Sequence, residues 1–319
     1  VRGADRAERL AEPPDVSNPA GAIRSDRDNG AFWCRRLHFR PSLTTLERVP
    51  ETSPILLWFR RDLRFQDNPA LARALGTGRT VLPVYIWSPE EEGEWAPGGA
   101  QRWWLHRALE SLAERLEAVG SRLILRRGAA LEEIRELVSE TGADAVYWNR
   151  RYEPEAIARD RELKASLKED GVDGRSFNAS LLYEPWNVST GQGRPYQVYT
   201  PFWKRTRELP VARPVNVEPG ALREAAPGSW PASESVDALG LLPDIPWYEK
   251  LEAVWTPSET AARRRLTQFI KDGVEAYNNE RDRPDRDGTS RLSPYLHFGH
   301  LGPRQAWAAV SDAGLDRTG

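Results

Sequence analysis

Short apolar runs alternate with helix-like stretches from residue 54 to residue 184. The runs have the length of single strands and read ILLWF (55–59), VLPVYIW (81–87), RLILR (122–126) and DAVYWN (144–149). Strands that are apolar almost throughout are typical of a parallel sheet covered by helices on both faces. We therefore predict an α/β fold for residues 53–184, built on a doubly wound, Rossmann-like parallel sheet.

One helix in this region is marked by the spacing of its apolar residues. Between Gln101 and Val119 they recur at spacings of four and three, at Leu105, Leu109, Leu112, Leu116 and Val119. Such spacing places them along one face of a helix. We expect that face to pack on the sheet.

The amino-acid composition of the chain changes after Pro185. Proline, glycine, tryptophan and charged residues break any long element up to residue 255, which predicts an interdomain linker over 185–255. Helical periodicity returns after Thr256, which is predicted to cap a helix with Pro257 at its first position and Glu259 completing a capping box.

This helix and a second one are predicted to begin an all-α domain. The buried face of the first is expected to carry Leu266, Phe269, Ile270, Val274 and Tyr277. The second is expected to start at Pro303. Residues 256–319 are too few to bury much of a core alone, so we expect an incomplete domain.

Residues 1–52 show neither helical nor strand periodicity. They are rich in Arg, Asp, Glu and Pro, which predicts a disordered extension, and their scattered acidic residues argue against a transit peptide.

The whole chain has 45 basic and 47 acidic residues, so a nucleic-acid surface would require local clustering of charge. With one cysteine, Cys34, and no long apolar segment, we expect a cytoplasmic protein with no membrane contact, and a monomer.

The turn after the first strand carries charge where a dinucleotide-binding sheet carries glycine. It reads WFRRDLRFQDNPAL, with no glycine between Leu57 and Leu75, so NAD cannot bind in the usual way. We interpret Arg60, Asp62 and Arg64 as a charged cluster that braces neighbouring loops. His297 and His300 lack a third ligand at a recognisable spacing, so no metal site is predicted.

A second polar segment, GTSRLSPYLHFG (288–299), has a stronger chemical case. Thr289, Ser290 and Ser293 supply hydroxyl donors, Arg291 supplies a fixed charge, and a helix start supplies backbone N–H groups. Together these groups could hold a diphosphate. On local chemistry alone an ordinary hydroxyl-rich helix cap explains the segment equally well.

Basic and aromatic residues are interleaved between residues 191 and 214. The cations are Arg194, Lys204, Arg205, Arg207 and Arg213, the aromatic residues are Tyr196, Tyr199, Phe202 and Trp203, and Glu208 is the one acid. This mixture of basic and aromatic residues is typical of nucleic-acid-binding surfaces. A solvated interdomain segment with its aromatic side chains packed against the sheet explains the same composition equally well. Separately, Glu153 has the position of a first-turn glutamate favoured by a helix dipole.

Five stretches taken together closely resemble the DNA photolyase/cryptochrome family. They are LLWFRRDLRFQDNPAL (56–71), GGAQRWWLHRALESL (98–112), VYWNRRYEP (146–154), GRPYQVYTPFWK (193–204) and YNNERDRPDRDGTSRLSPYLHFGHLGPRQ (277–305). The resemblance implies an α/β antenna domain joined by a long linker to a helical domain that holds FAD. It also implies that Tyr277 and the run Thr289, Ser290, Arg291, Leu292 and Ser293 bind the flavin phosphates and neighbouring groups. Finally, it implies that Arg281 faces damaged DNA and that Glu153 contributes to a folate antenna site, with a deazaflavin antenna left open.

The block GRPYQVYTPFWK resembles repair members, so the resemblance favours a class I-like cyclobutane pyrimidine dimer photolyase. Such an enzyme splits dimers in DNA with light and reduced FAD. The alternatives are a cryptochrome, a blue-light signalling photoreceptor without repair activity, and a standalone nucleotide-binding α/β module. The family's later helices, with most contacts to the flavin ring, are expected beyond residue 319. We therefore expect a C-terminally truncated chain that is inactive alone and binds FAD weakly or not at all.

Overall fold

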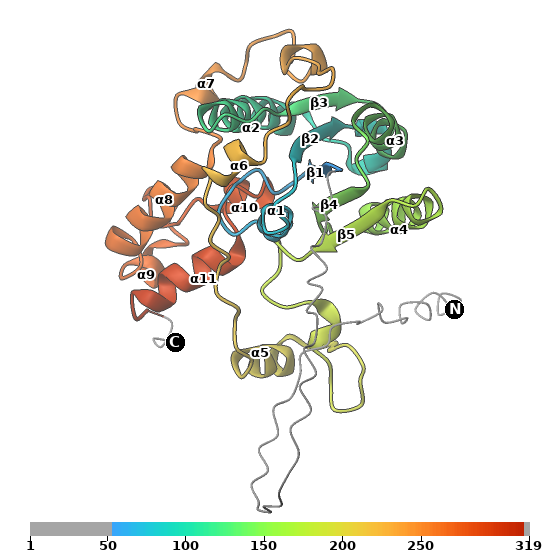
Figure 1. Ribbon diagram of the computed structural model, residues 1–319. Coiled ribbons are helices and arrows are strands. Elements are labelled where there is room, and N and C mark those ends of the chain that lie inside the picture. Colours follow the sequence, from blue (N-terminus) through green and yellow to red (C-terminus); the bar gives the residue numbers. More distant parts are fainter. Residues whose placement is uncertain (1–52, 316–319) are drawn as a thin grey trace, which may run out of the picture.

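Five parallel strands form the centre of the protein, which a computed structural model describes over residues 53–315. Their order in the sheet is β3-β2-β1-β4-β5. The strands are β1 (Ile55–Phe59), β2 (Val81–Trp87), β3 (Ile124–Arg127), β4 (Ala145–Asn149) and β5 (Asp173–Phe177). The predicted parallel sheet is confirmed (Figure 1). The extension predicted for residues 1–52 lies outside the described residues.

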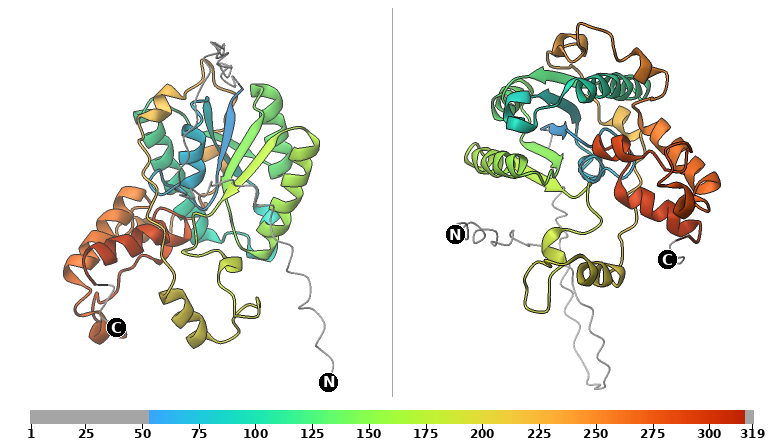
Figure 2. Two further views of the ribbon diagram at one scale, coloured as in Figure 1. Left: turned by 60° about the horizontal axis from the view of Figure 1, so that its bottom comes forward. Right: turned by 180° about the vertical axis from the view of Figure 1, so that it is seen from behind.

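The sheet is covered on both faces because neighbouring residues of a strand point to opposite sides. On one face, Leu57 and Phe59 of β1 join a core with α1 (Pro69–Leu75) and α2 (Gly99–Ala118). On the other face, Leu56 and Trp58 pack with α3 (Ala130–Thr141) and α4 (Pro154–Glu169). The doubly wound arrangement is therefore confirmed, and Figure 2 shows helices on both sides of the sheet.

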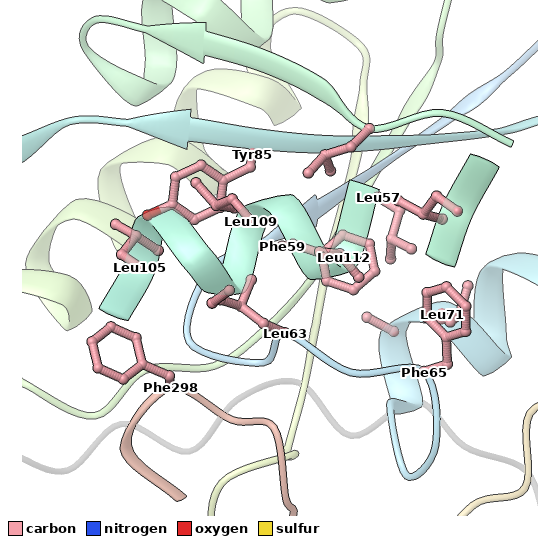
Figure 3. Close-up of a cluster of buried hydrophobic side chains, with 14 of the residues drawn as sticks. Leu57, Phe59, Leu63, Phe65, Leu71, Tyr85, Leu105, Leu109, Leu112 and Phe298 are labelled. Carbon is pink, nitrogen blue, oxygen red and sulfur yellow. The ribbon is translucent and has the colours of Figure 1, made fainter. Parts of the chain in front are cut away.

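The leucine stripe of α2 lies where the sequence predicts it. Its four leucines are buried, at Leu105, Leu109, Leu112 and Leu116, while Val119 just after the helix is half-buried. Figure 3 shows Leu109 and Leu112 beside Tyr85 and Phe59 of the sheet, with Leu63 and Phe298 nearby. Side chains of two sequence-distant segments, 63–65 and 292–301, thus share one core with the parallel sheet.

The segment between residues 185 and 255 contains short helices and adds to the core. They are η2 (Pro185–Asn187), α5 (Tyr199–Arg207), α6 (Ala221–Glu224), η3 (Asp237–Leu239) and α7 (Glu249–Glu252), with η1 (Pro89–Trp95) earlier in the chain. Leu222 and Leu239 are fully buried in the core. Residues 233–234 hydrogen-bond Leu125 through Glu234 N and Ser233 Oγ, which covers the free edge of β3.

The C-terminal helices are α8 (Glu259–Asp272), α9 (Tyr277–Glu280), α10 (Ser293–His297) and α11 (Pro303–Asp312). The start predicted at Pro303 is confirmed. The cap predicted at Thr256 is wrong, because it is the hydroxyl of Ser258 that accepts a hydrogen bond from Ala261 N at 3.1 Å. Tyr277 is also misassigned to the buried face of α8: it begins α9 and is 37% exposed.

These helices share the core of the sheet instead of forming their own. Ala262, Leu266, Leu292 and Leu301 belong to the same cluster as the leucines of α2. This agrees with the expectation that so few residues could not bury a separate core. Among the described residues, no helix has the length and apolar character needed to cross a bilayer.

Candidate functional site

The loop after β1 is bound directly to the segment that follows α10. Leu63 N donates to Phe298 O at 3.2 Å, and Arg64 donates to Gly299 O at 2.9 Å. Gly299 has φ +69°, and a Cβ there would overlap the Arg61 carbonyl oxygen. Glycine is therefore required at this contact, both for the backbone angle and for the close approach.

The charged cluster after β1 braces loops, as predicted. Arg60 donates to Asp160 at 2.7 Å and to the Asn149 carbonyl oxygen. Arg64 is 1% exposed and donates to four backbone carbonyls, those of Gln66 and Asp67 in its own loop and those of Ala179 and Gly299 in distant segments. Carboxylates or carbonyls thus accept hydrogen bonds from each buried guanidinium, which offsets part of the cost of burying its charge.

This cluster occupies the place where a doubly wound sheet normally binds its ligand. The strand order reverses between β1 and β4, and the crevice beyond their carboxyl ends is the usual ligand site. Here Arg60 from β1 and Asn149 from β4 meet across it. The side chains take the space that a dinucleotide would need, in agreement with the missing glycine fingerprint.

A small cavity of about 50 Å³ remains beside the cluster. Its lining comes from several elements: Trp58 of β1, Tyr85 of β2, Arg61 and Arg151 of the loops after β1 and β4, Arg159 of α4 and His297 of α10. Binding sites for organic ligands usually span about 300–1,000 Å³. The cavity in this structure is smaller than such sites.

Glu153 lies at the mouth of this region, at the N-cap of α4. Its carboxylate accepts hydrogen bonds from Arg61 at 2.8 Å and from Arg151 at 3.1 Å. Burial alone would raise the pKa of Glu153, but Arg151 and Arg61 outweigh it and lower the pKa to about 2. The group is thus a permanent anion and hydrogen-bond acceptor near neutral pH.

Arg265 of α8 hydrogen-bonds the backbone of the hydroxyl-rich segment 288–293. Arg265 donates to Ser290 O at 2.9 Å, to Thr289 O at 3.2 Å and to Asp287 Oδ1 at 3.1 Å. Leu292 is buried in the core. Both carbonyls are therefore fixed toward α8, and the loop is anchored at each end.

The remaining groups of this segment are available to a ligand. Thr289, Arg291 and Ser293 are exposed and Ser290 is half-buried. Within residues 53–315, no hydrogen bond of the three hydroxyls to another protein group is present, and Arg291, at φ +50°, pairs with Asp287 at 2.9 Å. Three free hydroxyls beside a guanidinium suit the oxygens of a diphosphate.

Tyr277 and Arg281 lie together on α9 and just after it. The Arg281 guanidinium is 5.9 Å from the centroid of the Tyr277 ring. α9 also lies against the hydroxyl segment, because a Cβ on Gly288 would overlap Glu280. The structure thus brings these two predicted residues to the neighbourhood of the segment 288–293.

A single short helix connects the two candidate sites. α10 begins at Ser293, in the hydroxyl segment, and ends at His297, which lines the cavity beside Arg61. Five residues of helix rise only about 6 Å between first and last, at about 1.5 Å per residue. Any group bound at one end of α10 would therefore lie close to the other.

Sequence reasoning did not single out Arg265, and it considered His300 only as a possible metal ligand. The signal for Arg265 was weak, because it is one of three consecutive arginines, 263–265, on α8. His300 is a core histidine, 1% exposed, that accepts a hydrogen bond from Trp104 Nε1 at 3.0 Å. Across residues 53–315, no group of three or more His, Cys, Asp or Glu side chains is arranged to hold a metal ion.

Comparison with known proteins gives a consistent result. The family model "DNA photolyase" matches residues 55–219. The chain is 43% identical over 268 residues to a deoxyribodipyrimidine photo-lyase of Agrobacterium fabrum, covering 84% of this chain and 54% of the relative. It is 36% identical over 258 residues to cryptochrome-2 of Arabidopsis thaliana, covering 79% of this chain and 42% of the relative.

A solved structure agrees with these sequence matches. It is a bacterial class III photolyase from Agrobacterium tumefaciens, with a TM-score of 0.78 and 41% identity over 86% of this chain and 56% of that one. Its class differs from the class I-like form expected from the motifs. The chain spans about half the length of the curated relatives it matches.

Proposed function

The chain belongs to the DNA photolyase family, and from that premise we propose that it supplies the antenna domain and the flavin-phosphate segment of a light-driven enzyme that repairs cyclobutane pyrimidine dimers in DNA. The observation that carries the proposal is the fixed segment 288–293. Arg265 holds its carbonyls on one side, while its hydroxyls have no protein partner among residues 53–315 and the exposed Arg291 pairs with Asp287 at 2.9 Å. The 43% identity to a photo-lyase supports the choice of reaction.

The residues of this segment fit the diphosphate of FAD. Thr289, Ser290 and Ser293 would donate hydrogen bonds to phosphate oxygens, and Arg291 would offset their charge. Reduced FAD, when bound, supplies the electron that splits the dimer under illumination. The protein's own part is to position the cofactor, and Arg265 and Leu292 keep the segment rigid for that purpose.

Arg281 is proposed to contact the DNA backbone. It is exposed, and its partner Asp282 lies 3.5 Å away on the surface, so the pair leaves guanidinium hydrogens available for a phosphate. Damaged base pairs leave the stack at lower cost than intact ones, which favours their selection.

The antenna proposal is folate, bound near Glu153. The hydrogen-bond partners of Glu153, Arg61 and Arg151, both line the small cavity beside the strand ends. Glu153 remains partly exposed, with 41% of its side chain accessible, and its low pKa keeps it a carboxylate. A carboxylate at the surface suits the amino and ring N–H donors of a pterin.

The second candidate is a cryptochrome-type photoreceptor. The similarity to cryptochrome-2 and cryptochrome-1 of Arabidopsis thaliana, at 36% and 37% identity, favours it almost as strongly as the similarity to photo-lyases favours repair. Both proteins would use the same segment for the flavin. They differ in whether illumination changes the DNA.

A chimera separates the two candidates. Residues 53–315 are joined to the part of the Agrobacterium fabrum photo-lyase that follows the matched region, and the product is supplied with FAD, reductant and thymine-dimer DNA. Under blue light we expect the dimers to be lost, as measured by a dimer-specific antibody, with no loss in the dark. A chimera that binds FAD but leaves the dimers intact contradicts repair and favours the photoreceptor. A Thr289→Ala/Ser293→Ala chimera should bind FAD at least tenfold more weakly, whereas unchanged binding contradicts the phosphate role.

A further inference from the structure

A second, larger cavity lies between α2 and the chain that leads from α7 into α8. Its volume is about 350 Å³, within the range of about 300–1,000 Å³ that is usual for organic ligands. One wall is a single face of α2, since its residues recur at helical spacing: Trp103, Arg107, Glu110, Ser111 and Glu114. The other wall is Glu252, Trp255 and residues 256–258. None of these residues belongs to the flavin-phosphate segment or to the charged cluster after β1.

The lining of this cavity is negatively charged. Its three carboxylates are Glu110, Glu114 and Glu252, and Arg107 is its one cation, so its net charge is −2. Arg107 donates to Glu110 at 2.9 Å and to Glu252 at 2.9 Å. Glu114 is exposed and has no cation within 4.0 Å among residues 53–315. A concave surface of this sign attracts cations and repels phosphates and carboxylates.

Two indole rings complete the lining. Trp103 is 1% exposed, and its Nε1 donates to Glu252 at 3.2 Å. Trp255 is half-buried and packs against Trp104 and Tyr295, with ring centroids 5.7 and 6.0 Å apart. Both indoles are therefore held by the core of the protein. Of the aromatic side chains, tryptophan attracts a cation most strongly, through the negative face of its ring.

A third indole extends this surface along α2. The ring of Trp247 lies over Gly99, one helical turn before Trp103, and a Cβ at Gly99 would be only 2.9 Å from that ring. Glycine at this position thus lets the indole rest on the helix. Trp247 is 45% exposed. The helix rises about 22 Å from Gly99 to Glu114, so the surface suits an elongated ligand.

We propose that this cavity binds organic cations through an ammonium or guanidinium group. Arg107 shows how the lining receives such a group, because its guanidinium lies between two carboxylates and is still 33% exposed. A ligand cation takes the next position along the same face, where the carboxylate of Glu114 and the ring of Trp255 are available. Within residues 53–315 the hydroxyls of Ser111 and Thr256 form no hydrogen bond to another protein group, so they can accept further ligand hydrogens.

Other classes of ligand fit the cavity less well. An anionic ligand would meet a net negative charge. An apolar ligand would remove the Glu114 carboxylate from water without giving it a partner, which costs free energy. A cation instead exchanges the hydration of Glu114 for an ion pair and gains the attraction of the indole rings.

The test measures binding of two cationic probes to the purified 319-residue chain by isothermal titration calorimetry at low salt. The first is agmatine, a free amine with a guanidinium at its other end, and the second is the peptide Gly-Arg-Gly-Arg-Gly. We expect saturable binding with a dissociation constant below about 1 mM for at least one of them. Tighter binding of agmatine identifies a small amine as the ligand, and tighter binding of the peptide identifies a basic segment of a protein.

Two variants localise the binding. Glu114→Gln removes the unpaired carboxylate and should weaken binding of the probe about fivefold, as loss of a partly exposed ion pair does. Trp255→Phe keeps a ring in the core but offers a weaker face to a cation, and should weaken binding about threefold. The matched control is Glu136→Gln on α3, which also removes an exposed carboxylate with no cation within 4.0 Å among residues 53–315 and should leave binding unchanged.

Three outcomes would overturn the proposal. One is the absence of saturable binding of both probes at low salt. Another is an equal loss of affinity in Glu114→Gln and Glu136→Gln, which would indicate diffuse attraction to the acidic surface. The third is unchanged affinity in both Glu114→Gln and Trp255→Phe, with circular dichroism showing each variant folded. The binding needs no flavin, lesion or light, so its failure leaves the repair proposal untouched.

Discussion

His300 should make the stability of the protein depend on pH in a defined way. The ring is buried between two partners: Trp104 Nε1 donates to Nε2, so the proton must be on Nδ1, which donates to Leu63 O at 3.2 Å. A second proton on Nε2 would remove the bond to Trp104 and place a charge in the core. Burial is the dominant cause that lowers the pKa of His300 to about 4, although the bond to Leu63 O opposes it.

The magnitude follows from linkage between protonation and folding. In the unfolded chain the histidine takes up its proton below a pKa of about 6.5, and in the folded chain only below about 4. Between these values the unfolded state binds more protons, so the free energy of unfolding increases with pH. Above about pH 6.5 the histidine is neutral in both states and does not lower the free energy of unfolding. On acidification to pH 5 the free energy of unfolding falls by roughly 2 kcal/mol on account of His300, and below pH 4 the total loss reaches about 3.4 kcal/mol.

The assay is urea unfolding of the 319-residue chain and its His300→Gln variant at pH 8 and pH 5. Carboxylates contribute equally to both proteins, so the difference between the two pH-dependent losses isolates the histidine. We expect the parent protein to lose about 2 kcal/mol more than the variant over this interval. Equal losses would refute the assignment of a buried neutral imidazole, and a larger loss in the variant would reverse its sign.

Three further predictions concern residues that connect elements or sites. Arg265→Gln, which releases two carbonyl oxygens of segment 288–293, should weaken FAD binding to the chimera about tenfold at unchanged helicity; an unchanged dissociation constant from flavin fluorescence contradicts the positioning role. Glu259→Gln should cost about 3 kcal/mol in urea unfolding, because Glu259 is 2% exposed and pairs with Arg115, and a loss below about 1 kcal/mol would count against it. Glu153→Gln should reduce folate binding, measured by absorbance after gel filtration. The parent protein should bind folate equally well at pH 5 and pH 8, because the pKa of Glu153 is about 2. A marked loss of folate binding by the parent protein at pH 5 would argue against a role for the carboxylate.

The predictability of the fold depends on how deeply each element is buried. β1, β2 and β4 are buried along their whole length and were evident as apolar runs. β5 reads DGRSF and is exposed or half-buried, since it pairs on one side only, so its sequence carried no apolar signal. The cap at Ser258 was missed for a different reason: two hydroxyl residues two positions apart can both cap a helix, and backbone geometry decides between them.

The residue types of the candidate site could be predicted from the sequence, but their arrangement in space could not. The hydroxyls and the arginine of segment 288–293 were visible as a group because they are consecutive. Arg265 reaches that segment from more than twenty residues away, and no local pattern distinguishes it from its neighbours Arg263 and Arg264. The exposure of Trp203 was likewise unpredictable, because helical spacing shows which residues share a face and does not show what the face contacts.

The arginine and carboxylate cluster explains how a nucleotide-type sheet can serve a site that lies elsewhere. A glycine-rich first turn would leave the crevice open for a ligand. Here Arg60 and Asn149 meet across it, and Arg64 of the same loop binds the carbonyls of Ala179 and Gly299, which come from different parts of the chain. Gly299 follows α10, whose first residue belongs to the hydroxyl segment. The loop whose side chains close the crevice thereby also fixes the helix that begins at the proposed flavin-phosphate site. A charged first turn in place of a glycine-rich one therefore both closes the crevice and holds the segment after α10.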